Sequence, residues 1–116
     1  MTHAFVEPHK DFEINQISII EDIYTKVGEE NNVLVIPVGL AFDIAYKELP
    51  DIKLHHDDGT HPNLKGTYLA ACTVFASIYG ESPIGLKYDY YGAINKDDKK
   101  LLQEIAHKAT FMYLNE

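Results

Sequence analysis

The sequence has one cysteine and few basic residues. The single Cys72 excludes an internal disulfide, and its place within a helical pattern predicts a buried thiol. Ten Lys and Arg residues stand against 18 Asp and Glu residues, which gives a formal net charge of -8. Because nucleic acids and anionic membranes are bound through basic patches, this composition argues against both as partners.

Long apolar runs, repeats and low-complexity segments are also absent from the sequence. No run reaches the roughly 18 apolar residues that a membrane-spanning helix needs. The first thirty residues lack the basic and apolar regions of a secretory signal peptide, but that absence is informative only if Met1 begins the natural chain. Residues 1–8 look instead like the end of a strand and its exit loop within a domain, so the compartment stays open.

A histidine-rich turn is the most distinctive feature that is present. Its centre is Asp58-Gly59-Thr60-His61, and the ends of such a four-residue turn lie within about 7 Å of each other. We therefore expect the Asp58 carboxylate to accept a hydrogen bond of about 2.7 to 3.2 Å from Nδ1 of His61. That bond would leave Nε2 of His61 free to take a proton from a hydroxyl group. Pro62 disfavours the α conformation at His61, which should lie just before a helix.

The residues around this turn resemble the C-terminal part of SGNH (GDSL-type) hydrolases. The resemblance covers the string from Asp58 to Asn63, residues 66–71 and residues 80–86, which include a Ser-Pro-Ile-Gly-Leu segment. It implies that Asp58 and His61 are the Asp and His of a Ser-His-Asp triad. It also implies a small-molecule ester substrate, such as an acylated carbohydrate or a lipid.

Other parts of the SGNH pattern are missing. The family carries its nucleophile in an N-terminal Gly-Asp-Ser block, and a Gly and an Asn from middle blocks help to form the oxyanion hole. None of these blocks is present. Ser82 follows Gly80 and Glu81, but it lies beyond the histidine where the family has a connecting loop, so we do not take it as the nucleophile. The polypeptide as given should therefore not turn over esters at an enzymatic rate.

Two apolar segments predict strands. Residues 2–6 form a short candidate, and residues 32–38 form a continuous β-branched run, typical of a strand that is buried on both faces of a parallel sheet. Ligands bind outside the carboxyl ends of such strands. Gly39 and Leu40, which follow the second run, are therefore candidate substrate-binding residues.

Helical periodicity or capping residues predict four helices. The first covers about residues 12–28 with Gly28 near its end, and a short one covers residues 41–49 before Pro50. A third spans residues 63–79 with Asn63 as its N-cap. The last spans about residues 96–114 with Asn95 as its N-cap.

These elements predict an α/β fold, a partial three-layer α/β/α sandwich of SGNH or flavodoxin-like type. Residues 1–116 would be a single domain or the C-terminal portion of a larger SGNH hydrolase domain. Two strands alone make a poor sheet with exposed edges. We therefore expect the chain to pair with a missing N-terminal segment or to self-associate.

The sequence also contains residue types that bind metals, namely His55, His56, Asp57, Asp58 and His61. No second cluster of such residues accompanies them, so the sequence predicts neither a metal nor another cofactor.

Two functions are compatible with the sequence. The chain is either the C-terminal part of an SGNH-like ester hydrolase or a non-catalytic remnant or interaction module of that fold.

Overall fold

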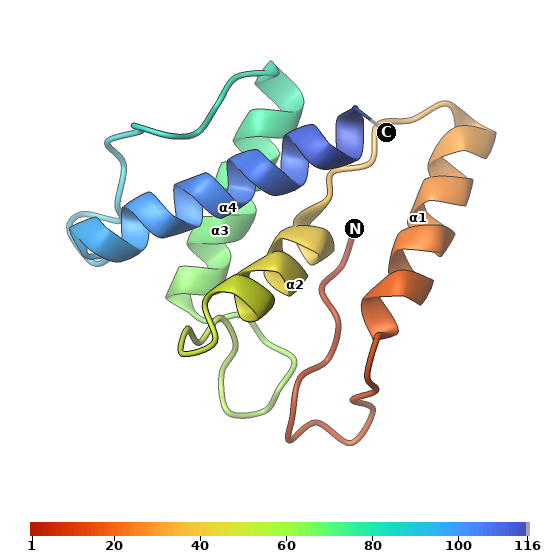
Figure 1. Cartoon of the computed structure of the whole chain (residues 1–116), viewed down its shortest axis with the longest axis horizontal. Coiled ribbons are helices and arrows are strands. Elements are labelled where there is room, and N and C mark those ends of the chain that lie inside the picture. The colour runs from red at the N-terminus through yellow and green to blue at the C-terminus, as the bar shows by residue number, and fades with distance from the viewer. Residues whose placement is uncertain (116) are drawn as a thin grey trace.

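Four helices make up the regular structure of residues 1–115, the part of the chain that the computed structural model describes. They are α1 (Gln16–Asn31), α2 (Val38–Glu48), α3 (Leu64–Tyr79) and α4 (Lys96–Leu114). Figure 1 shows α3 and α4 crossing each other, with α2 beside them and α1 at one side of the molecule. None of these helices is long and apolar enough to cross a membrane.

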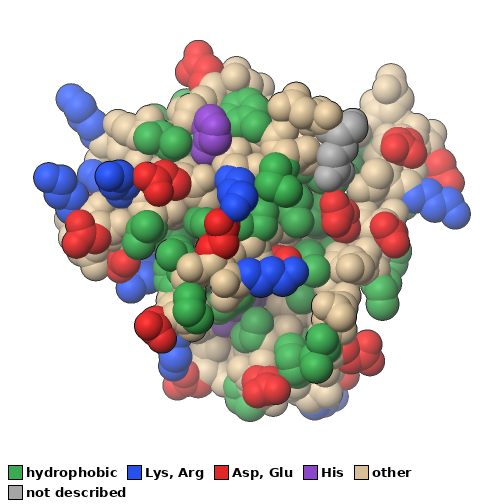
Figure 2. Space-filling view, in the orientation of Figure 1, with side chains coloured by type: hydrophobic (Ala, Val, Ile, Leu, Met, Phe, Trp, Pro, Cys, Tyr) green, Lys and Arg blue, Asp and Glu red, His purple; other side chains and the backbone are tan. Residues whose placement is uncertain are grey.

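The core lies where α2, α3 and α4 meet. Each of these three helices packs against the other two. Leu69, Leu102 and Ala106 are fully buried there, and Leu54, from the loop after α2, joins the same cluster. Figure 2 shows further apolar side chains on the surface, between acidic and basic ones.

Helix α1 is attached less extensively than the other helices. It packs against α2, and the Thr25 hydroxyl makes a 2.6 Å hydrogen bond with that of Tyr113 at the end of α4. In α1 itself only Ile17 and Gly28 are buried, whereas Ile19, Ile23 and Val27 are each about half exposed or more. Much of its apolar surface therefore faces outwards.

The predicted α/β sandwich is wrong, because residues 1–115 contain no sheet. The only β-type contact there is an isolated bridge between His55 and Pro62. The run that should be a doubly buried strand is extended but irregular, and Val33 and Leu34 are 57% and 55% exposed. Only Met1 reaches the end of this run: its N-terminal amine donates to the carbonyl of Ile36 at 2.9 Å, and its carbonyl accepts the N–H of Gly39 at 3.1 Å.

The physical reason is a shortage of backbone partners. A central strand needs a neighbour on each edge, and two adjacent segments without further strands make a marginal sheet. Pro37 has no N–H to donate, and α2 begins directly after it at Val38. The helices, whose backbone hydrogen bonds are internal, form without such partners.

The predicted helices are confirmed, with shifted boundaries for the first two. α1 begins four residues later than expected and runs past Gly28 to Asn31, where Asn32 ends it in a left-handed conformation. Both predicted N-caps are confirmed: Asn63 accepts the N–H of Gly66 at 3.0 Å, and Asn95 accepts that of Asp98 at 2.8 Å. Capping depends on neighbouring residues alone, which explains why the sequence revealed it.

The histidine-rich turn is held between the N-terminal segment and α3. The N–H of Val6 donates to the carbonyl of Gly59 at 2.9 Å, and the N–H of Asn63 donates to that of Leu54 at 2.9 Å. A Cβ at Gly59 would overlap the carbonyl oxygen of Val6, and a Cβ at Gly66 would overlap that of Leu54. Both contacts therefore require glycine, and Gly59 also has a positive φ of 75°.

We expect Gly59→Ala to destabilise the fold more than Gly80→Ala. Both glycines have positive φ, and a side chain there costs about 1 to 2 kcal/mol, but a Cβ at Gly80 meets no atom within 4 Å. Overlap with Val6 should add about 1 to 3 kcal/mol to the loss at Gly59. Urea unfolding measures both variants, and equal losses would show that the turn is not packed against residues 6–9.

Candidate functional site

Asp58 and His61 form the hydrogen bond that the sequence predicts. Oδ2 of Asp58 lies 2.5 Å from Nδ1 of His61. Oδ1 of the same carboxylate accepts the backbone N–H groups of Thr60 and His61, each at 3.0 Å. Three donors therefore fix the carboxylate, and the carboxylate fixes the imidazole ring.

This arrangement keeps Asp58 ionised. The hydrogen bonds from the backbone of Thr60 and of His61, and then the bond from the His61 ring, hold the pKa of Asp58 well below its usual range. An ionised carboxylate accepts but cannot donate, so the proton in the shared hydrogen bond belongs to Nδ1 of His61.

The other ring nitrogen of His61 is available. The side chain is 76% exposed, and its Nε2 makes no hydrogen bond with any residue from 1 to 115. The backbone of His61 is held in place, because its carbonyl accepts the N–H of His56 at 2.8 Å. The pair is thus a positioned base that faces outwards.

No nucleophile accompanies this base within the described chain. Ser82 makes a 2.8 Å hydrogen bond with Nδ1 of a different histidine, His107. It follows α3, whereas His61 precedes it, and the 16 residues of this helix span about 24 Å. Cys72 is buried as predicted, and burial raises the pKa of its thiol to about 11, which keeps it protonated.

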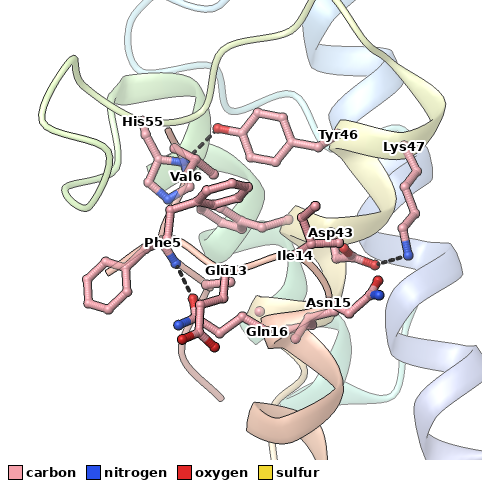
Figure 3. A pocket seen from close by; sticks show the side chains of 15 residues that line it. Phe5, Val6, Glu13, Ile14, Asn15, Gln16, Asp43, Tyr46, Lys47 and His55 are labelled. Carbon is pink, nitrogen blue, oxygen red and sulfur yellow. Dashed lines mark hydrogen bonds and ion pairs between the residues drawn. The ribbon is translucent and has the colours of Figure 1, made fainter. Parts of the chain in front are cut away.

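A pocket lies beside the histidine-rich turn. It has a volume of about 280 Å³ and is bounded by the N-terminal segment, residues 12–17, α2 and His55 (Figure 3). We call it the aromatic pocket, because Phe5, Phe12, Phe42 and Tyr46 line it. Of the two predicted substrate-binding residues, Gly39 lines this pocket, whereas Leu40 packs against the core of the three helices.

A chain of ring hydrogen bonds in the pocket wall was not predicted. Nδ1 of His55 lies 2.6 Å from the Tyr46 hydroxyl, and Nε2 of His55 lies 3.0 Å from Nδ1 of His3. His55 is only 6% exposed, and burial, followed by the nearby His3, lowers its pKa to about 4. His55 is therefore a neutral structural residue, and its partner 52 positions away could not be read from local spacing.

The residue types of a metal site do not converge. His55 points towards Tyr46 and His3, while Asp58 binds His61, and the side chains of His56 and Asp57 are exposed. Across residues 1–115 no group of three or more His, Cys, Asp or Glu side chains could hold a metal ion.

Comparison with known proteins gives one structural likeness. No family model matches the sequence, and no curated protein matches it. The chain is similar to a crystal structure described as a DUF4886 family protein from Bacteroides uniformis, with a TM-score of 0.82 and 26% sequence identity. The match covers 99% of this chain and 47% of that one, so the chain spans about half the length of the solved protein. The description names no function.

We expect neutral His61 to carry its proton on Nδ1. Asp58→Ala removes the acceptor, so the proton should redistribute towards Nε2, and the ¹⁵N chemical shifts of the ring measure that change directly. Asp57→Ala is the matched control, since the Asp57 side chain is fully exposed and lies 3.7 Å from Lys53. A proton on Nε2 in the unaltered protein would contradict the orientation described here.

We expect His55 to make the fold less stable in acid. In the unfolded chain His55 has its ordinary pKa of about 6.5, whereas burial lowers the pKa to about 4 in the folded chain. Stability should therefore fall as the pH drops between these values, by about 1.4 kcal/mol per pH unit and about 3 kcal/mol in total. Urea unfolding across this range should show a shallower loss in His55→Gln. An unchanged profile in that variant, equal to that of His56→Gln, would refute the assignment.

Proposed function

We propose that this chain supplies the general base and its orienting carboxylate to an ester hydrolase of the Ser-His-Asp kind. In this proposal His61 is the base, Asp58 holds it in the correct tautomer, and the nucleophilic serine belongs to a polypeptide segment other than residues 1–115. The observation that carries the proposal is the 2.5 Å hydrogen bond between Asp58 and Nδ1 of His61, which leaves Nε2 of the exposed ring free to accept a proton.

The chemistry follows from this geometry. Nε2 would take the proton of a serine hydroxyl as the oxygen attacks the ester carbonyl, and would later return it to the leaving alcohol. Asp58 would stabilise the imidazolium that forms between these steps. The resemblance of residues 58–63, 66–71 and 80–86 to SGNH hydrolases supports the same roles, although the helical fold of this chain does not support the family's α/β architecture.

The proposal requires a partner that brings the serine and the oxyanion donors. The surface offers apolar contact for one: Val33 and Leu34, as well as Ile19 and Ile23 of α1, are each more than half exposed. Large contiguous apolar patches are uncommon on soluble monomers. We take an N-terminal segment of the same domain as the partner, and self-association is the other arrangement that would cover these side chains.

A second candidate function is a non-catalytic interaction module. The same exposed apolar side chains favour it, as does the lack of a nucleophile beside His61 in residues 1–115. In that case the Asp58–His61 pair would serve only to shape the turn before α3.

Kinetics of p-nitrophenyl acetate hydrolysis test the proposal. The chain alone should show no more than the background rate of free imidazole. Co-expressed with the segment encoded upstream of Met1, it should form an enzyme that loses roughly 10³-fold or more of its kcat/KM in His61→Ala. Asp58→Asn should lose roughly 10² to 10⁴-fold, because the ring then adopts the wrong tautomer.

The matched control is His56→Ala, since His56 is an exposed neighbour on the same turn. Its activity should stay near that of the unaltered assembly. An assembly that hydrolyses no ester, or that loses equal activity in His56→Ala and His61→Ala, would favour the interaction module instead.

A further inference from the structure

The aromatic pocket is a preformed cavity with fixed walls. The ring of Phe42, which is 2% exposed, stacks on His3 with centroids 5.0 Å apart, and Phe5 stacks on His9 at 4.0 Å. Tyr46 is held by His55 and by the N–H of Leu54, which its hydroxyl accepts at 3.1 Å. A ligand that enters does not need to order these rings, which lowers the entropic cost of binding.

We infer that this pocket binds a compact, neutral, apolar group, either an aromatic ring or a short acyl chain. The identification of that group as the acyl part of an ester rests on the proposed function. Nothing in the inference that an apolar group binds depends on catalysis.

Many of the hydrogen-bonding groups in the wall are already paired, although the exposed residues Glu13 and Asn15 also line the pocket. Both ring nitrogens of His55 are engaged by Tyr46 and His3. The side-chain oxygen of Gln16 accepts the N–H of Phe5 at 3.0 Å, and Asp43 pairs with Lys47 at 2.9 Å (Figure 3). With these groups engaged and Phe5, Phe12, Phe42 and Tyr46 in the wall, apolar contact dominates recognition, which suits a hydrocarbon group.

Charge selects against anionic ligands. The ionisable side chains that line the pocket are Glu13, Asp43, Lys47, Tyr46 and His55, and His3 lies behind His55. Two carboxylates outnumber one ammonium group, while the tyrosine and the buried histidine are neutral near pH 7. With a net charge of -8 on the whole chain, a free carboxylate should bind less well than its neutral ester.

Size limits the ligand further. A dry apolar cavity of about 150 Å³ accommodates benzene, and the aromatic pocket measures about 280 Å³. One ring with a short substituent, or an acyl chain of comparable volume, therefore fits.

The pocket adjoins the turn that displays His61. Val6 lines the pocket and donates its N–H to Gly59, the residue that follows Asp58. His55 lines it too, and forms the isolated bridge with Pro62, the residue that follows His61. A bound group thus lies one backbone segment away from the base, which links the pocket to the proposed chemistry.

The test is a ¹H–¹⁵N NMR titration of the chain with methyl benzoate, and separately with benzoate. Methyl benzoate should cause saturable shifts at residues 4–6, at residues 42–46 and at His55, with contacts from its ring protons to Phe5 and Phe42 in nuclear Overhauser spectra. Benzoate should bind at least several-fold more weakly. Shifts that do not saturate, or equal binding of the two compounds, would overturn the inference.

A pocket-filling variant sharpens the test. Ala4 lines the pocket, so Ala4→Phe should weaken methyl benzoate binding at least tenfold, whereas Ala71→Phe, on the exposed side of α3, should not. If Ala4→Phe does not fold, the nuclear Overhauser contacts from methyl benzoate to Phe5 and Phe42 in the unaltered protein still test whether the pocket binds it. Their absence would overturn the inference.

His61→Ala separates this inference from the proposed function. The variant should keep its affinity for methyl benzoate, because His61 does not line the pocket. Binding without hydrolysis in the co-expressed assembly would reject the proposed function alone. Hydrolysis without binding at the aromatic pocket would reject this inference alone.

Discussion

The close approach of the histidine-rich turn to its two neighbours is the constraint on which the rest of the site depends. Gly59 lets the turn touch the carbonyl of Val6, and Gly66 lets α3 begin against the carbonyl of Leu54. These contacts fix both ends of the segment that carries Asp58 and His61. They also attach the N-terminal segment, which forms one wall of the aromatic pocket. Base and pocket are therefore positioned by the same few backbone contacts.

Features that depend on neighbouring residues could be predicted from the sequence. The Asp58–His61 hydrogen bond arises from a three-residue spacing around a glycine, and the Asn63 cap arises from a three-residue spacing at the start of α3. The extended run at 33–36 could not be predicted in the same way, because a strand exists only when another strand supplies its hydrogen bonds. Its apolar, β-branched side chains predict that the segment is buried. In residues 1–115, however, Val33 and Leu34 are exposed.

The contact between His3 and His55 also could not be predicted from the sequence, because it depends on tertiary packing. His3 and His55 are 52 positions apart and meet only because the N-terminal segment folds back across α2. In the sequence His55 is only one of several metal-binding residue types on the turn, whereas packing gives it a buried, neutral role beside Tyr46. Of the histidines on the turn, His61 alone combines an ionised carboxylate partner with an outward-facing second nitrogen. Their different surroundings, not their residue type, separate a structural residue from a candidate base.

The proposed catalytic role assigns the nucleophile to a segment that residues 1–115 do not contain, and this assignment is the central claim of the account. It is tested most directly by treating the active assembly with a fluorophosphonate and locating the modified serine by peptide mass spectrometry. The account predicts modification of a serine outside the 116 residues, which is lost in His61→Ala. Modification of Ser18, Ser77 or Ser82, the serines of this chain, would contradict it.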